Sequence, residues 1–94
     1  MRNSAAVLRI IRDGETIRSV PLEGEALLGR AEGCVIRLED RAVSRQHALF
    51  RRVGEGVQVE KKSEFAPLVV NGEDCTRAVL KEGDVISLGP YLLK

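Results

Sequence analysis

The sequence predicts an all-β domain in which two sheets pack against each other. Nine glycines and three prolines divide the chain at roughly regular intervals, and the segments between them have the length of strands rather than helices. About ten segments qualify as strands. Because a typical sheet holds about four to six strands, two packed sheets accommodate them better than one sheet does.

The first two strands are expected to form a hairpin. Residues 6–12 make the first strand and residues 15–20 the second, which ends at Pro21. Between them lies Asp13-Gly14, a pair that tolerates the positive φ angles of a type I′ turn. The domain is therefore predicted to begin with a tight antiparallel pair.

The next part of the chain alternates short strands with polar loops. A third strand is predicted over residues 26–29 and a fourth over residues 34–38, where apolar and polar positions alternate. Polar loops follow them at residues 30–33 and 39–46. The second loop is longer than a hairpin needs, and long loops on a rigid sheet are where binding residues usually gather.

The remaining strands continue this pattern to the end of the chain. They are predicted over residues 47–53, 57–61, 68–70, 84–88 and 91–94. Residues 54–56 contain two glycines and form a turn. Asn71-Gly72 is another pair suited to a type I′ turn, and a further hairpin is expected after it.

Charge and composition exclude several classes of protein. Fifteen basic and fourteen acidic residues give a net charge of +1, and aromatic residues make up only 3%, which argues against a nucleic-acid partner. No apolar run approaches the ~20 residues of a membrane-spanning helix, and the amino terminus lacks the apolar core of a secretory signal. We therefore expect a cytoplasmic location and no membrane contact.

Positive charge nevertheless concentrates in the middle of the chain. Residues 30–62 carry eight basic and five acidic groups, whereas residues 63–94 carry three and five. A local excess of this size suits one small anion, such as a phosphate group on a partner.

The sequence offers little for catalysis or metal binding. Ser44 and His47 are close enough to begin a serine–histidine dyad, but no orienting carboxylate or oxyanion donor accompanies them. Residues 24–30 lack the Lys-Ser/Thr pair of a nucleotide-binding P-loop. Cys34 and Cys75 have no Cys or His at metal-ligand spacing. We therefore expect no enzymatic activity, no cofactor and no metal.

Five short motifs stand in order between residues 27 and 89. They read LLGR from Leu27, CVIRLED from Cys34, VSRQHA from Val43, VVNG from Val69 and LKEGDVISLG from Leu80. Together they resemble the forkhead-associated (FHA) family. The resemblance implies a two-sheet β-sandwich of the SMAD/FHA-like type with about ten or eleven short strands, and a single domain over residues 1–94 with its motif core at 27–89.

The resemblance also implies a module that binds phosphothreonine in a partner from a Ser/Thr kinase pathway. It assigns phosphate contacts to Arg30, Ser44 and Arg45. Structural roles in the loops fall to Gly29, His47, Asn71 and Gly72. The chemistry agrees, because a phosphothreonine carries a charge of about −1.5 to −2 and three acceptor oxygens, which a guanidinium and a short hydroxyl can bind.

One loop departs from the family pattern. Ala66 and Pro67 stand where the family has asparagine and glycine, so a side-chain contact to the peptide backbone and a backbone N–H are missing. Two hypotheses follow: a phosphothreonine-dependent module that reads its peptide differently, and a phosphate-independent FHA-like scaffold for protein assembly, for example in a bacterial secretion system. An exposed Phe65 would be a natural protein anchor in the second case.

Overall fold

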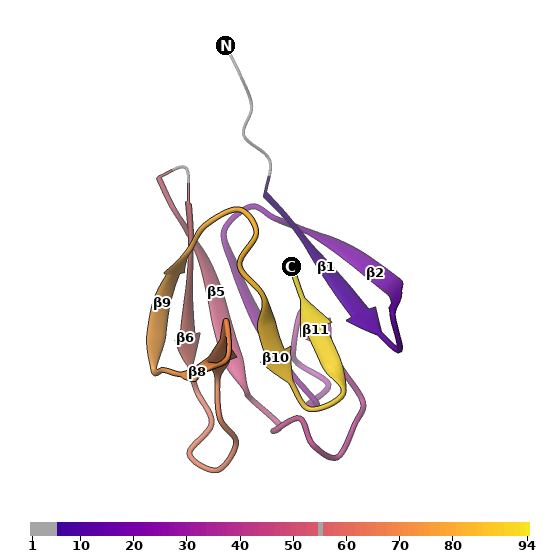
Figure 1. Cartoon of the computed structure of the whole chain (residues 1–94). Helices are drawn as coiled ribbons and strands as arrows, with labels where there is room; N and C mark the ends of the chain where they lie inside the picture. Colours follow the sequence, from indigo (N-terminus) through magenta and orange to yellow (C-terminus); the bar gives the residue numbers. More distant parts are fainter. Residues whose placement is uncertain (1–5, 55) are drawn as a thin grey trace.

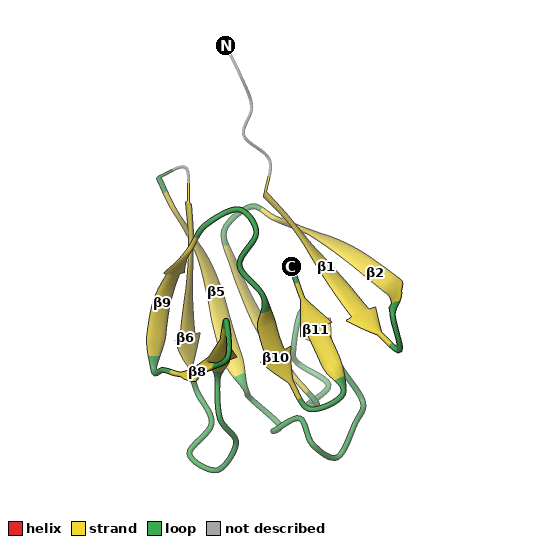
Figure 2. Cartoon of the chain, viewed as in Figure 1, coloured by secondary structure: helices red, strands yellow, loops and turns green. Residues whose placement is uncertain are grey.

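The computed structural model describes residues 6–54 and 56–94, and all regular structure in this part is β-strand (Figure 2). The strands are β1 (Ala6–Arg12), β2 (Glu15–Leu22), β3 (Glu25–Gly29), β4 (Ile36–Arg37), β5 (Ala48–Val53), β6 (Gly56–Lys61), β7 (Val69–Val70), β8 (Glu73–Asp74), β9 (Arg77–Leu80), β10 (Ile86–Leu88) and β11 (Tyr91–Leu93). The described residues include no helix with the length and apolarity that crossing a bilayer requires.

The strands form two sheets that face each other (Figure 1). One sheet has six strands in the order β2-β1-β11-β10-β7-β8, and the other has five in the order β4-β3-β5-β6-β9. Within the five-stranded sheet, β3 and β4 run parallel, whereas β5 lies antiparallel to both β3 and β6. The predicted all-β sandwich is confirmed.

The amino-terminal hairpin forms as predicted, apart from its end. Asp13 and Gly14 have φ angles of 55° and 80°, as a type I′ turn requires. The expectation that Pro21 ends the second strand is wrong, because β2 continues to Leu22 and Pro21 lies opposite Val7. Strand β2 is an edge strand of its sheet, and an edge tolerates a residue that has no N–H to donate.

The fourth strand is shorter than predicted, although its alternation is correct. Only Ile36 and Arg37 pair with β3, because the N–H of Cys34 is bonded to Ala31 in a turn. Cys34 and Ile36 are nevertheless buried while Arg37 is exposed. The side chains thus follow the predicted two-residue period outside the paired segment.

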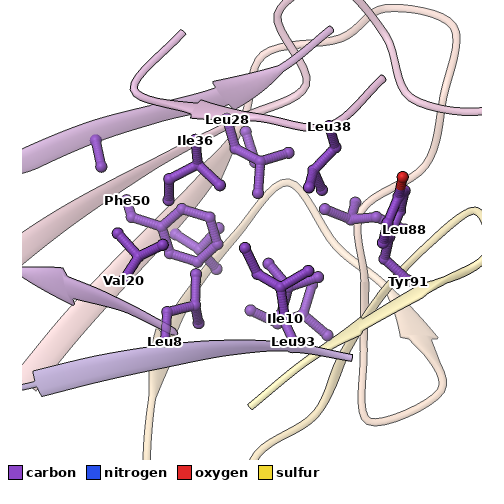
Figure 3. Close-up of a cluster of buried hydrophobic side chains, with 14 of the residues drawn as sticks. Leu8, Ile10, Val20, Leu28, Ile36, Leu38, Phe50, Leu88, Tyr91 and Leu93 are labelled. Carbon is purple, nitrogen blue, oxygen red and sulfur yellow. The ribbon is translucent and has the colours of Figure 1, made fainter. Parts of the chain in front are cut away.

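The core fills the space between the sheets. Figure 3 shows side chains from both sheets meeting around Phe50, which is fully buried in β5. Ile10 and Leu93 come from the six-stranded sheet, and Leu28 and Ile36 come from the five-stranded sheet. Apolar contact on this scale fixes the strand ends, so the loops that leave them start from rigid positions.

A polar clamp joins the β7–β8 turn to the connection before β10. The Asn71 amide Nδ2 donates to Asp84 Oδ1 at 3.0 Å, and Asn71 Oδ1 accepts the Val85 N–H at 3.0 Å. The Lys81 N–H donates to Asp84 Oδ2 at 2.8 Å. Two hydrogen bonds hold the pKa of Asp84 below its usual value: the bond from Asn71 has the larger effect and the bond from the Lys81 N–H the smaller. Both bonds favour the ionised carboxylate.

This clamp predicts acid sensitivity. A carboxyl whose pKa is lower in the folded state stabilises the fold above its unfolded pKa of about 3.9 and loses that contribution as the pH falls through the folded value. We expect the urea midpoint of Asp84→Asn to fall less than that of the wild type between about pH 5 and about pH 3. Glu82→Gln, an exposed neighbour, is the control. Equal decreases in Asp84→Asn and the wild type would contradict this role for Asp84.

Candidate functional site

Three loops meet at one end of the sandwich, in the lower part of Figure 1. They follow β3, precede β5 and follow β6. The N–H of Arg30 donates to the Ser44 carbonyl at 2.9 Å, which joins the first two loops, and the N–H of Lys62 donates to the His47 carbonyl at 2.9 Å, which joins the third. Backbone hydrogen bonds therefore hold all three loops together.

Gly29 permits the closest approach between two of these loops. It ends β3 directly against residues 45 and 46. A Cβ atom on Gly29 would overlap the carbonyl oxygen of Arg45 and would lie 2.7 Å from its carbonyl carbon. These are backbone atoms, which cannot rotate aside as a side chain can. Only glycine fits this position without moving Arg30 or the segment around Ser44.

His47 braces the second loop against the third. Its side chain is buried, with 1% exposed. Its Nδ1 accepts the Ser44 N–H at 3.1 Å, and its Nε2 lies 2.9 Å from the Pro67 carbonyl oxygen. Because Nδ1 accepts, Nε2 carries the proton and donates to Pro67. The imidazole thus contacts the backbone of Ser44 and not its hydroxyl, which removes the serine–histidine dyad.

The hydroxyl of Ser44 instead meets a second serine. Ser44 Oγ lies 2.7 Å from Ser63 Oγ, which also accepts the N–H groups of Phe65 at 3.0 Å and Ala66 at 2.9 Å. Sequence reasoning missed Ser63 as a site residue. A serine whose hydroxyl accepts N–H groups two and three positions later is a recognised local pattern, and that spacing is the signal that could have identified it.

An open groove of about 570 Å³ runs between these loops. Its lining includes Arg30, Ser44 and Arg45, so the structure brings the three predicted phosphate contacts together. The Nε of Arg30 donates to the Val43 carbonyl at 3.1 Å, which steers the guanidinium. Within the described part of the chain, the two Nη atoms of Arg30 make no hydrogen bond.

The charges along the groove favour an anion. Arg30, Arg45 and Lys62 line it, against a single carboxylate from Glu64. Lys62 was not singled out by the sequence, although it belongs to the basic middle of the chain. Its Nζ lies 3.7 Å from Glu60, and an exposed pair of this kind is weak enough to rearrange.

Two of the predicted loop residues lie away from the groove. The side chain of Asn71 is bonded to Asp84 and Val85, and Asn71 and Gly72 form the β7–β8 turn with φ angles of 53° and 84°. Phe65, in contrast, lines the groove and has 95% of its surface exposed.

Another hollow contains none of the predicted contacts. It has a volume of about 510 Å³ and lies between Leu8, Val57 and Leu80, beside the start of β6, whereas the groove lies beyond the end of that strand. The described residues contain no group of three or more His, Cys, Asp or Glu side chains that could hold a metal ion. The groove is therefore the candidate site.

Comparisons with known proteins agree with the fold. The FHA domain family matches residues 26–89. The oxoglutarate dehydrogenase inhibitor of Corynebacterium jeikeium is 38% identical over 65 residues, which make up 69% of this chain and 45% of that protein. The chain thus spans less than half the length of this relative.

Solved structures show the same fold. The FhaA FHA domain, complexed with the intracellular domain of Rv3910, is 31% identical with a TM-score of 0.83, and the match covers 93% of this chain and 94% of that one. A domain solved in work on phosphothreonine-dependent FHA domain interactions is 28% identical with a TM-score of 0.81, and the match covers 94% and 93%.

Proposed function

We propose that this chain, which belongs to the FHA domain family, is a binding module that recognises phosphothreonine in a partner protein. The observation that carries the proposal is the shared groove of Arg30, Ser44 and Arg45. A binding module rather than an enzyme also fits the contacts of His47, whose two ring nitrogens are occupied by Ser44 and Pro67.

The groove is suited to a phosphate dianion. A guanidinium offers several N–H donors in one plane and can bind two phosphate oxygens at once. The Nε bond from Arg30 to Val43 limits the rotamers of the side chain before a ligand arrives, which lowers the entropy lost on binding. Ser44 adds a hydroxyl, and Arg45 and Lys62 add positive charge.

The rest of the proposal follows from the chemistry of the ligand. A protein that binds phosphothreonine depends on a Ser/Thr kinase that phosphorylates its partner, so the partner belongs to a Ser/Thr kinase pathway. We place the module in the cytoplasm. We take residues 1–94 as a single domain. The proposal includes no nucleic-acid partner, no membrane contact, no cofactor and no metal.

Fluorescence anisotropy with three degenerate peptide pools tests this function. The pools carry phosphothreonine, phosphoserine or threonine at the central position and are otherwise the same. We expect binding to the phosphothreonine pool and none to the threonine pool. Equal binding to the phosphothreonine and threonine pools would overturn the proposal.

A second candidate function rests on Phe65. Phe65 is 95% exposed. Its N–H donates a hydrogen bond to Ser63 Oγ, so the backbone that carries the exposed ring is held in place. Ala66 and Pro67 follow it in place of the asparagine and glycine of the family pattern. A phosphate-independent scaffold that docks a partner through Phe65 would use these features.

If the chain is a phosphate-independent scaffold that binds through Phe65, Phe65→Ser should weaken its complex with the partner. Burying a phenyl ring contributes about 1.5–3 kcal/mol, so the loss of the ring would weaken a phosphate-independent complex by roughly 10-fold to 100-fold. The measurement is the affinity for the intact partner after phosphatase treatment. Val79→Ser, on the exposed side of β9, is the matched control. Full affinity in Phe65→Ser would exclude Phe65 as the anchor.

A further inference from the structure

Ser63 is a buried hydroxyl at the wall of the groove. It has 7% of its surface exposed and directly follows Lys62, which begins the third loop. Its N–H approaches the His47 carbonyl at 3.3 Å, and its Oγ approaches three polar groups: the Ser44 hydroxyl and the N–H groups of Phe65 and Ala66.

These contacts determine which serine donates. A hydroxyl has one hydrogen to donate and two lone pairs to accept with. The N–H groups of Phe65 and Ala66 can only donate, so they occupy both lone pairs of Ser63 Oγ. The remaining contact, with Ser44 at 2.7 Å, must use the hydrogen of Ser63. Ser44 is therefore the acceptor in this pair.

The direction of this bond leaves the hydrogen of Ser44 available. The Ser44 hydroxyl lines the groove beside Arg30 and Arg45. A hydroxyl that already accepts a hydrogen bond is polarised, which strengthens its own donation. If Ser44 instead donated to Ser63, its hydrogen would be used in that bond and only a lone pair would remain to face an anion.

We propose that Ser63 is a positioning residue that fixes Ser44 as a hydrogen-bond donor to the phosphate. The inference rests on the proposed function and extends it to a residue outside the predicted set. The Ser44–Ser63 pair would then favour a ligand oxygen that accepts hydrogen bonds and has no hydrogen to donate, as in a phosphate dianion. The N–H groups of Phe65 and Ala66 are already bonded to Ser63, so Ser44 supplies the donor at this wall.

A double-mutant cycle tests the proposal with the phosphothreonine peptide pool. We expect Ser63→Ala and Ser44→Ala each to weaken binding by about 10-fold, the effect of one hydrogen bond to a charged group. The double variant should lose no more than about 10-fold, because Ser63 acts through the hydroxyl that Ser44→Ala removes. A purely structural role for Ser63 would make the two losses multiply, and this outcome would overturn the proposal.

Two further variants separate positioning from folding. Ser63→Thr keeps the hydroxyl and should restore most of the affinity, whereas Ser63→Cys keeps nearly the same shape but donates and accepts only weakly, and should bind like Ser63→Ala. Thermal unfolding checks that each variant is folded, and Ser19→Ala, at an exposed position of β2, is the control. Full affinity in Ser63→Cys would also overturn the proposal.

The outcomes distinguish this inference from the function on which it rests. If the wild type binds the phosphothreonine and threonine pools equally, the proposed function fails and the role of Ser63 fails with it. If the wild type prefers phosphothreonine but the losses in Ser44→Ala and Ser63→Ala multiply, the function stands and only the positioning role is wrong.

Discussion

Arg30→Ala is expected to weaken binding to the phosphothreonine pool on the order of 100-fold or more, the loss of two charge-assisted hydrogen bonds. The two Nη groups of Arg30 carry donors that have no partner within the described part of the protein. Arg45 brings a second guanidinium to the groove, so the affinity that remains in Arg30→Ala measures what Ser44, Arg45 and Lys62 bind without Arg30.

The geometry of the guanidinium matters beyond its charge. Arg30 uses its Nε on the Val43 carbonyl and keeps its Nη groups for the ligand. Arg30→Lys retains the positive charge, but its three donors sit on one nitrogen and lack the planar fork that lets a guanidinium contact Val43 and two phosphate oxygens at once. We therefore expect Arg30→Lys to recover only part of the affinity that Arg30→Ala loses, as measured in the same anisotropy titration.

Arg41→Ala is the matched control for this experiment. Arg41 is an exposed arginine in the loop before β5, outside the lining of the groove, and its loss changes the net charge by the same amount. We expect it to bind the pool nearly as the wild type does. Similar losses in Arg30→Ala and Arg41→Ala would show that general electrostatic attraction, rather than a specific contact, drives binding.

Local sequence signals were sufficient wherever local chemistry decides the structure. The pairs Asp13-Gly14 and Asn71-Gly72 have the positive φ angles predicted for them, because few other residues tolerate that conformation. The strand pattern was equally readable, since one buried face imposes a two-residue period. The grouping of Arg30 with Ser44 came from the family resemblance and not from composition or spacing.

Contacts between distant segments could not be predicted in the same way. A further hairpin was expected after Asn71-Gly72, but the chain there forms β8 and β9, which belong to opposite sheets. The alternation of apolar residues predicts which face of a strand is buried, but it does not predict which sheet the strand joins. The bond between Ser44 and Ser63 likewise depends on how two loops meet in space.

Gly29→Ala is expected to have the largest effect on stability of any substitution near the groove. The added Cβ would overlap backbone atoms of Arg45, and overpacking of this kind costs about 1–3 kcal/mol. For a domain of this size the midpoint of thermal unfolding should fall on the order of 10 °C. The measurement is thermal unfolding followed by circular dichroism, with a urea titration to confirm the change in free energy of unfolding.

The same substitution should also abolish phosphate recognition in molecules that remain folded. The clash is relieved only if β3 moves, which displaces Arg30, or if the segment around Arg45 moves, which displaces Ser44; either movement separates the guanidinium from the hydroxyl. Gly33→Ala is the matched control, since a Cβ there meets no atom within 4 Å and alanine at such a position is neutral or slightly stabilising. Wild-type stability and affinity in Gly29→Ala would show that the two loops can separate without cost, and the groove would then not be the preorganised site that the proposed function requires.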